Sequence, residues 1–334
     1  MAIAKPGYTS NSVSIDRFGF RLQYDNAGDL IDLGTIKEKY KNCSVLLGNS
    51  TSFGVAVTHD RRTLGHFLNE ADSPCINLSV RGATMQQELA VFLTFKHLLP
   101  RPKRIVLLTG VCDVSLAVQP EDFSVPEAGG MHSMSTYAKQ YIDWTEKSPD
   151  APTQIKNLFL ESAEDFYLKN QWFQKLIQPK LLNNKIIKKI AKISKAQALS
   201  NLKNILPLLG NVMETWSWIQ KAQGIEINVA LQPIAGWTKK KLTDAEQMCI
   251  SADNERIHTT CLYANEQVYE IVKRFYQEAT MSHGLNFIDT NSCFDASYKE
   301  DATLFSDFCH LTDSGMTVLG EYLRSQIKPV YTLI

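Results

Sequence analysis

Short apolar runs alternate with helix-like stretches along the first third of this chain. The runs are CSVLL at 43–47, CINLSV at 75–80 and RIVLLT at 104–109, and MQQELAVFLTFKHLL at 85–99 has apolar residues at helical spacing. Strands that are apolar at successive positions are buried on both faces, and a strand–helix–strand order joins parallel neighbours. The pattern predicts an α/β fold, a three-layer sandwich with a central, mostly parallel sheet.

The alternation resumes towards the C-terminus. IEINVALQ at 225–232 and LNFIDT at 285–290 are typical of strands, and helical stretches follow each of them at 264–284 and 313–327. The sheet is therefore expected to have about five strands within one domain covering 1–334. Residues 1–40 are polar and rich in turns, which predicts a leader packed on the domain edge, and the long helical stretches of 115–222 predict a helical insertion or cap.

Composition narrows the range of functions. The 44% hydrophobic content is enough for a sizeable core, and 35 basic residues balance 35 acidic ones, which argues against a nucleic-acid partner. The N-terminus has no apolar segment typical of a secretory signal, and no apolar run is long enough to span a membrane, so we expect a cytoplasmic protein without stable membrane insertion. The 7 cysteines form no CxxC pair, which indicates reduced thiols rather than a disulfide framework or a zinc ribbon.

A serine lies on the turn after the first predicted strand. GNSTSFG at 48–54 places Ser50 between that strand and TLGHFLNEA at 63–71, which predicts a helix. A serine on a sharp strand-to-helix turn exposes its hydroxyl, and backbone N–H groups at the helix start point towards a developing oxyanion. Serine and glycine are also ordinary turn residues, so this motif needs companions before it indicates catalysis.

The companion motif is DFCH at 307–310, just before the last helix. A carboxylate at Asp307, three residues ahead of His310, can reach Nδ1 on a turn and leave Nε2 free as a base. An isolated pair of this kind is equally typical of a turn-capping aspartate beside a packed histidine. In combination with Ser50, however, the pair supplies the other two roles of a catalytic triad.

These motifs together resemble the SGNH/GDSL hydrolase family. Ser50 follows the first strand, Gly82 the second and GVCD at 110–113 the third, and DFCH at 307–310 precedes the final helix, in the family's order. The resemblance implies a flavodoxin-like SGNH fold with Ser50 as nucleophile, Asp307 and His310 as its partners, and backbone N–H groups of Ser50 and Gly82 in the oxyanion hole. It implies no metal and no organic cofactor.

The sequence departs from the family pattern at two positions. Asn49 stands where the family has aspartate, and Cys112 stands where the family has the asparagine whose amide is an oxyanion donor. A thiol is a weak donor, and loss of one oxyanion donor costs about 10² to 10³ in turnover. Catalysis could then depend on the Ser50 and Gly82 backbone amides, another side chain could substitute, or activity could be low.

The expected function is a serine esterase that removes an acyl group, with O-acetyl foremost, from a carbohydrate or related small ester. The carbohydrate preference comes from SVSIDRFGFR at 12–21, which is similar to leaders of SGNH proteins associated with bacterial surface polysaccharides, and from LQP at 231–233. One alternative is a carbohydrate O-acyltransferase that takes its acyl group from acyl-CoA or an acyl-carrier protein.

Further alternatives follow from the two departures and from the insertion. One is a catalytically weakened protein that binds a glycan or a partner, and another is a thiol enzyme that uses Cys112 or Cys309 beside His310. The basic stretch KLLNNKIIKKIAKISK at 180–195 is typical of a lid helix with a solvated basic face, and also of a surface that receives an anionic acyl donor.

Overall fold

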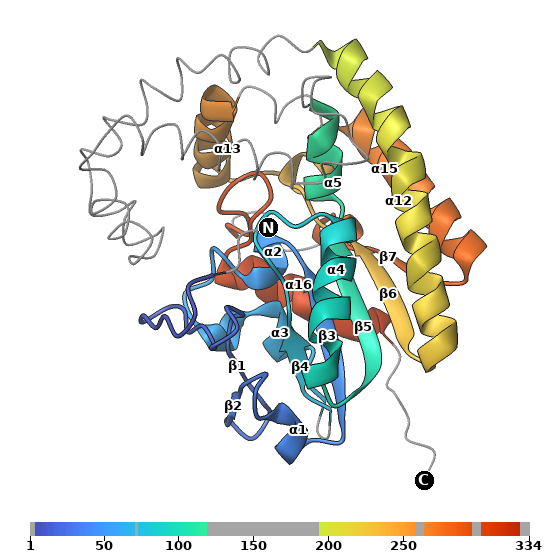
Figure 1. Cartoon of the computed structure of the whole chain (residues 1–334). Helices are drawn as coiled ribbons and strands as arrows, with labels where there is room; N and C mark the ends of the chain where they lie inside the picture. The colour runs from blue at the N-terminus through green and yellow to red at the C-terminus, as the bar shows by residue number, and fades with distance from the viewer. Residues whose placement is uncertain (1–3, 71–72, 119–193, 258–263, 296–301, 328–334) are drawn as a thin grey trace, which may run out of the picture.

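The computed structural model describes residues 4–70, 73–118, 194–257, 264–295 and 302–327. Its centre is a five-stranded sheet in the order β4-β3-β5-β6-β7, and every neighbouring pair is parallel (Figure 1). The strands are β3 (Asn42–Gly48), β4 (Cys75–Asn77), β5 (Arg101–Thr109), β6 (Glu226–Leu231) and β7 (Asn286–Asp289). All five predicted strands and the predicted α/β class are confirmed.

Side chains of the strands alternate between two hydrophobic clusters, one on each face. In β3, Val45 and Leu47 belong to one cluster and Leu46 to the other. The first cluster packs under α4 (Met85–Phe95), α12 (Lys195–Gln223) and α15 (Glu266–His283), and the second under α3 (Leu64–Phe67) and α16 (Asp313–Gln326). Figure 1 shows these helices on opposite faces of the sheet, as the predicted three layers require.

The helix α12 corrects the predicted extent of the insertion. It begins with Ser194, whose side chain accepts a hydrogen bond from the Gln197 N–H, and ends at Gly224 in the left-handed conformation. Because α12 leads directly into β6 and buries its apolar face on the sheet, it belongs to the α/β layers rather than to a cap. Residues 119–193, and with them nearly all of the basic stretch at 180–195, lie outside the described residues.

The N-terminal leader packs on the domain through its own small elements. The antiparallel pair β1 (Gln23–Tyr24) and β2 (Leu30–Ile31) precedes α1 (Ile36–Lys39). Phe20 lies in the first of the two hydrophobic clusters, the main hydrophobic cluster. Arg21 is fully buried and forms an ion pair with Asp60 in the segment after the Ser50 turn. The leader is therefore integrated into the core beside that turn.

The remaining elements are short, apart from α13 (Asp244–Ile257), which the sequence patterns did not predict. The helix expected over 63–71 is only the single turn α3. The others are α2 (Ser50–Phe53), α5 (Val111–Ser115) and the 3₁₀ helices η1 (Asp60–Arg62), η2 (Lys96–Leu98), η3 (Leu116–Val118), η4 (Ala235–Trp237) and η5 (Asn291–Phe294).

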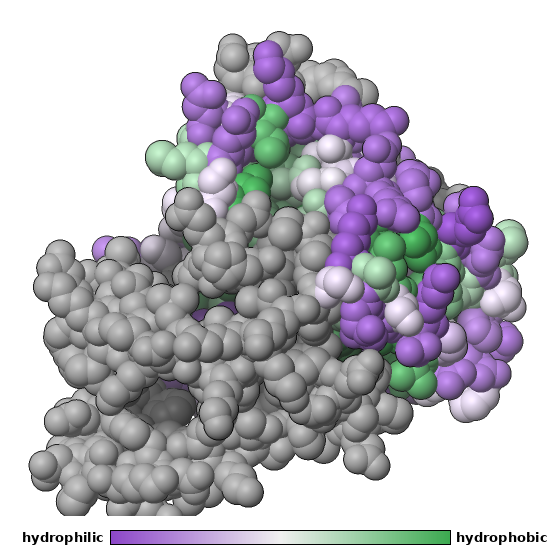
Figure 2. All heavy atoms as spheres, turned by 90° about the horizontal axis from the view of Figure 1, so that it is seen from above, coloured by the Kyte–Doolittle hydropathy of each residue, from purple (hydrophilic) through white to green (hydrophobic). Residues whose placement is uncertain are grey.

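The described surface is mainly hydrophilic in the view from above, with hydrophobic residues between the hydrophilic ones (Figure 2). Within the described ranges, no helix has both the length and the apolar character needed to cross a membrane. The cysteines of these ranges, Cys43, Cys75, Cys112, Cys249, Cys293 and Cys309, are free thiols.

Candidate active site

The Ser50 turn is built around a glycine that no other residue could replace without a clash. Gly48 ends β3 at a φ of +154°, and a Cβ there would lie 2.3 Å from Ser52 Oγ and 2.4 Å from the Leu108 carbonyl oxygen. The chain then enters the single turn of α2, whose first residue is Ser50. Ser50 is therefore presented, partly exposed, at the carboxyl edge of the sheet.

The turn at 307–310 holds a histidine between a carboxylate and that serine. Asp307 Oδ1 accepts the backbone N–H groups of Cys309 (2.9 Å) and His310 (2.8 Å), which fixes the turn. Asp307 Oδ2 lies 2.5 Å from His310 Nδ1, and His310 Nε2 lies 2.7 Å from Ser50 Oγ. Because an ionised carboxylate only accepts hydrogen bonds, Nδ1 carries the imidazole proton and the Nε2 lone pair faces the serine hydroxyl.

The electrostatics keep Asp307 ionised. Burial raises the pKa of this carboxyl, but the hydrogen bond and charge of His310 and the two backbone N–H groups outweigh burial, so the pKa of Asp307 lies below its ordinary value. The three residues that the sequence predicts as a triad are therefore within hydrogen-bonding distance in the order serine, histidine, aspartate.

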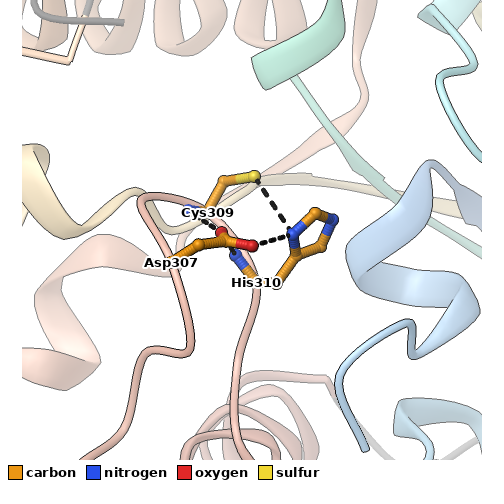
Figure 3. A group of neighbouring side chains, drawn as sticks. All are labelled: Asp307, Cys309 and His310. Atoms are coloured by element: carbon orange, nitrogen blue, oxygen red, sulfur yellow. Dashed lines mark hydrogen bonds and ion pairs between the residues drawn. The ribbon is translucent and has the colours of Figure 1, made fainter. Parts of the chain in front are cut away.

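Cys309 lies beside this pair, as Figure 3 shows. Its Sγ is 3.8 Å from His310 Nδ1, and ligand atoms of Asp307, Cys309 and His310 all lie within 4.8 Å of one another. Two ligands of a tetrahedral zinc ion are about 3.3 Å apart, whereas Asp307 Oδ2 and His310 Nδ1 are 2.5 Å apart and share a hydrogen bond. The group thus fits a carboxylate–imidazole pair better than a metal site.

The same geometry can be compared with the alternative in which Cys112 or Cys309, rather than Ser50, is the nucleophile beside His310. Cys309 is buried on the Nδ1 side of the imidazole, whereas the basic Nε2 faces Ser50. Burial and the nearby carboxyls raise the pKa of the Cys112 thiol, which disfavours the thiolate that a cysteine nucleophile needs. The arrangement favours Ser50 over either cysteine.

The predicted oxyanion residues follow the strands that flank the Ser50 turn. Gly82 lies in the turn after β4 at a φ of +72° and is exposed, and Gly110 follows β5 and opens α5, which contains Cys112. Cys112 is partly buried and packs against the main hydrophobic cluster. All of these positions lie at the carboxyl edge of adjacent parallel strands, where α/β folds bind ligands, but their oxyanion roles stay predictions.

Sequence analysis missed two further residues at this edge. Gln232 follows β6 and Asn291 follows β7, both are fully buried, and the Asn291 amide donates to the Gln232 carbonyl at 3.3 Å. The available signal was a polar side chain directly after an apolar strand. In the sequence, LQP at 231–233 contributed only a weak resemblance to the family. The sequence could not indicate more, because it does not say which residues meet across the sheet.

Two buried acids lie near Cys112, one of them next to it in α5 and the other on α4. Asp113 accepts hydrogen bonds from the Met85 N–H and the Thr109 hydroxyl, both at 3.1 Å, and Glu88 on α4 is 1% exposed. Burial raises the pKa of Asp113 to about 6. Burial, together with repulsion from Asp113, raises the pKa of Glu88 well above its usual range.

Glu88 is expected to make the fold less stable as pH rises. Because its folded-state pKa is raised, the native state binds more protons than the unfolded state once pH exceeds the ordinary value of 4.5, and stability declines until pH passes the folded-state pKa. Glu88→Gln cannot ionise, so the difference in melting temperature between about pH 5 and about pH 8 should shrink. Glu321→Gln, on the exposed face of α16, is the control and should keep the wild-type slope, and an unchanged slope in Glu88→Gln would contradict the prediction.

No protein-family model and no curated protein sequence matches this chain. Among solved structures, it is similar to phospholipase A1 from Streptomyces albidoflavus (12% identity, covering 86% of this chain and 100% of that one, TM-score 0.44). It is also similar to an extracellular lipase from Streptomyces rimosus (14%, 86% and 100%, 0.43) and a GDSL-like lipase from Bacteroides thetaiotaomicron (12%, 86% and 88%, 0.37). At these values the activity has to be argued from the residues of the chain itself.

Proposed function

We propose that this chain is a serine hydrolase of the SGNH/GDSL type that cleaves acyl esters. The observation that carries the proposal is the continuous hydrogen-bond chain from Ser50 Oγ to His310 Nε2 (2.7 Å) and from His310 Nδ1 to Asp307 Oδ2 (2.5 Å). A base within this distance of a hydroxyl, itself oriented by a carboxylate, is the arrangement that activates a serine nucleophile. A protein that only binds a glycan or a partner has no need of all three residues in this order.

The proposed reaction has two halves. As Ser50 Oγ attacks the ester carbonyl, His310 Nε2 takes its proton and Asp307 stabilises the imidazolium. The tetrahedral intermediate expels the alcohol, which receives that proton, and leaves an acyl-enzyme. Water then attacks the acyl-enzyme by the same steps, with backbone N–H groups of Ser50 and Gly82 as the proposed oxyanion donors. None of these steps needs a metal or an organic cofactor.

The proposed substrate is a carbohydrate or related small ester that carries an O-acetyl group. Support comes from the resemblance of SVSIDRFGFR at 12–21 to leaders of polysaccharide-associated SGNH proteins. Transfer to a sugar hydroxyl would use the same residues, with the hydroxyl in place of water and acyl-CoA or an acyl-carrier protein as donor. Product analysis with and without a sugar acceptor distinguishes hydrolysis from transfer.

The test of the proposed nucleophile is labelling by a fluorophosphonate, read by intact mass, alongside hydrolysis of an acetyl ester. Wild type is expected to gain one label and to hydrolyse the ester, and Ser50→Ala is expected to do neither, because the probe reacts with an activated serine. Ser292→Ala, which changes an exposed serine, is the control and should behave as wild type. Labelling that persists in Ser50→Ala, or a wild type that neither labels nor hydrolyses, would overturn the proposal.

Cys112 provides a separate prediction about the oxyanion hole. If the Cys112 side chain occupies the position of the family's donor asparagine, Cys112→Asn replaces a thiol, which is a weak donor, by an amide donor. Turnover of the acetyl ester should then increase, by up to about 10²-fold, or stay near wild type. A collapse of turnover in a folded Cys112→Asn protein would show that the thiol has a role of its own.

A further inference from the structure

A buried hydrogen-bond network joins the turn of Ser50 to the turn of His310. Asn49 Nδ2 donates to Gln232 Oε1 at 2.6 Å, and Gln232 Nε2 donates to Thr51 Oγ1 at 2.7 Å and to the Cys309 carbonyl at 3.4 Å. The Thr51 hydroxyl donates to the same carbonyl at 2.9 Å. Asn49 and Thr51 flank Ser50, and Cys309 directly precedes His310.

The chemistry of the Cys309 carbonyl sets the direction of the whole network. A carbonyl oxygen only accepts, so the Thr51 hydroxyl has to donate to it and presents its lone pairs to Gln232. The amide nitrogen of Gln232 therefore faces Thr51, and its oxygen faces residue 49. The side chain of residue 49 therefore has to donate a hydrogen bond to Gln232 Oε1. It also has to accept one, because Asn49 Oδ1 accepts the Thr51 backbone N–H at 3.1 Å.

At a pH where a carboxyl group is ionised, only an amide meets both demands at position 49. An aspartate has two acceptor oxygens, so it would place a carboxylate oxygen against Gln232 Oε1, where the donor now lies at 2.6 Å. Turning the Gln232 amide over would relieve that repulsion but would direct its oxygen at the Cys309 carbonyl. Asn49 and Gln232 are 0% exposed and Thr51 is 1% exposed, so water has no access to repair a broken link.

We infer that Asn49 and Gln232 are a matched pair of positioning residues. Their hydrogen bonds hold the turn of Ser50, the nucleophile turn, in position against the turn of His310, the base turn. The inference rests on the proposed function for its kinetic readouts. It also gives a physical reason for the departure at position 49, where the family has aspartate. Here the Gln232 amide oxygen faces that position, and the asparagine amide is the group that satisfies it.

The first test is Asn49→Asp, which restores the family residue and changes no volume. The rate of fluorophosphonate labelling and the kcat for an acetyl ester should both fall, by about 10²-fold, because displacement of the serine from the base by about 1 Å has that effect. KM should change little, since neither side chain contacts substrate in the proposed reaction. Wild-type kinetics in a folded Asn49→Asp protein would overturn the inference.

The second test uses Gln232→Glu and measures activity against pH. If Gln232 had a purely structural role, the pH profile of this variant would have the same shape as that of wild type. A protonated glutamic acid reproduces the pattern, with one oxygen accepting from Asn49 and the O–H donating to Thr51, whereas the ionised form has no donor. Burial raises the pKa of such a carboxyl, and Asp307 and Asp289 raise it further, while a protonated His310 would lower it. The activity of the variant should fall as pH rises, in the range where wild type has reached its plateau because its base is neutral.

Two further variants serve as controls. Gln232→Met has no polar atom and should lose labelling rate at every pH. Asn228→Asp makes the same chemical change at a buried asparagine near the amino end of β6, away from both turns, so it should lower the melting temperature without changing the labelling rate of folded protein. A pH profile of Gln232→Glu that matches wild type would contradict the proposed donor pattern.

A readout without activity separates this inference from the proposed function. The low-field proton resonance of the His310 Nδ1–H reports the geometry of the base turn, and Asn49→Asp should shift or broaden it while Asn228→Asp leaves it in place. If wild type does not react with the fluorophosphonate, the proposed function fails and the resonance alone decides the inference. A resonance that Asn49→Asp leaves unchanged would overturn it.

Discussion

Asp307→Asn is expected to lower kcat for an acetyl ester by about 10⁴-fold while leaving the protein folded. The ionised carboxylate accepts the Nδ1 proton at 2.5 Å and thereby keeps the lone pair on Nε2, which faces Ser50. An asparagine amide can donate to Nδ1 instead, which moves the imidazole proton to Nε2 and removes the base. The measurement is steady-state hydrolysis, with circular dichroism to verify the fold.

The control for this change is Asp313→Asn. Asp313 lies in the first turn of α16, near the same edge of the sheet, and accepts hydrogen bonds from the Thr58 backbone N–H at 2.9 Å and hydroxyl at 2.5 Å. It has no contact with His310 in the hydrogen-bond chain, so its kcat should stay near the wild-type value. A loss of less than about tenfold in Asp307→Asn would show that the carboxylate does not set the tautomer.

Arg21→Met is expected to lower the free energy of unfolding by about 3–5 kcal/mol, the usual result when one partner of a buried ion pair is removed. The Arg21 side chain is 0% exposed, and its Nε donates to Asp60 Oδ1 at 2.8 Å. The same guanidinium donates to the Phe53 carbonyl at 3.4 Å and to the Gly54 carbonyl, at the end of α2. The substitution leaves the Asp60 charge buried without its partner.

Urea unfolding of Arg21→Met measures this effect, and two further variants interpret it. Arg61→Met removes an exposed arginine that stacks over Tyr24 at 4.1 Å, and its loss should lower stability by less than about 1 kcal/mol. Adding Asp60→Asn to Arg21→Met should recover part of the lost stability, because the unpaired charge is gone. No recovery in the double variant would attribute the loss to the hydrogen bonds of the guanidinium with the Ser12, Phe53 and Gly54 carbonyls rather than to the ion pair.

Local patterns in the sequence were sufficient to predict the sheet and to single out Ser50, Asp307 and His310, which the fold brings within hydrogen-bonding distance and whose catalytic roles stay predictions. All five strands appear at the predicted positions. In β3 and β5 the signal is a continuous apolar run, because a strand buried on both faces has to be apolar at successive positions, whereas the edge strand β7 includes the polar residues Asn286 and Asp289. Ser50 and the 307–310 turn could be found because each motif is contained within a few residues. The oxyanion roles of Gly82 and Cys112 and the cytoplasmic location stay predictions.

Tertiary structure decided what depends on residues far apart in the chain. Helical periodicity in 195–223 could not say whether that helix caps the domain or covers the sheet, since both surroundings favour the same amphipathic pattern. Likewise, Gln232 is an ordinary polar residue after a strand until the parallel sheet brings it against Asn49, Thr51 and the Cys309 carbonyl. A hydrogen bond needs both partners within about 3 Å, and only the folded chain determines which groups meet.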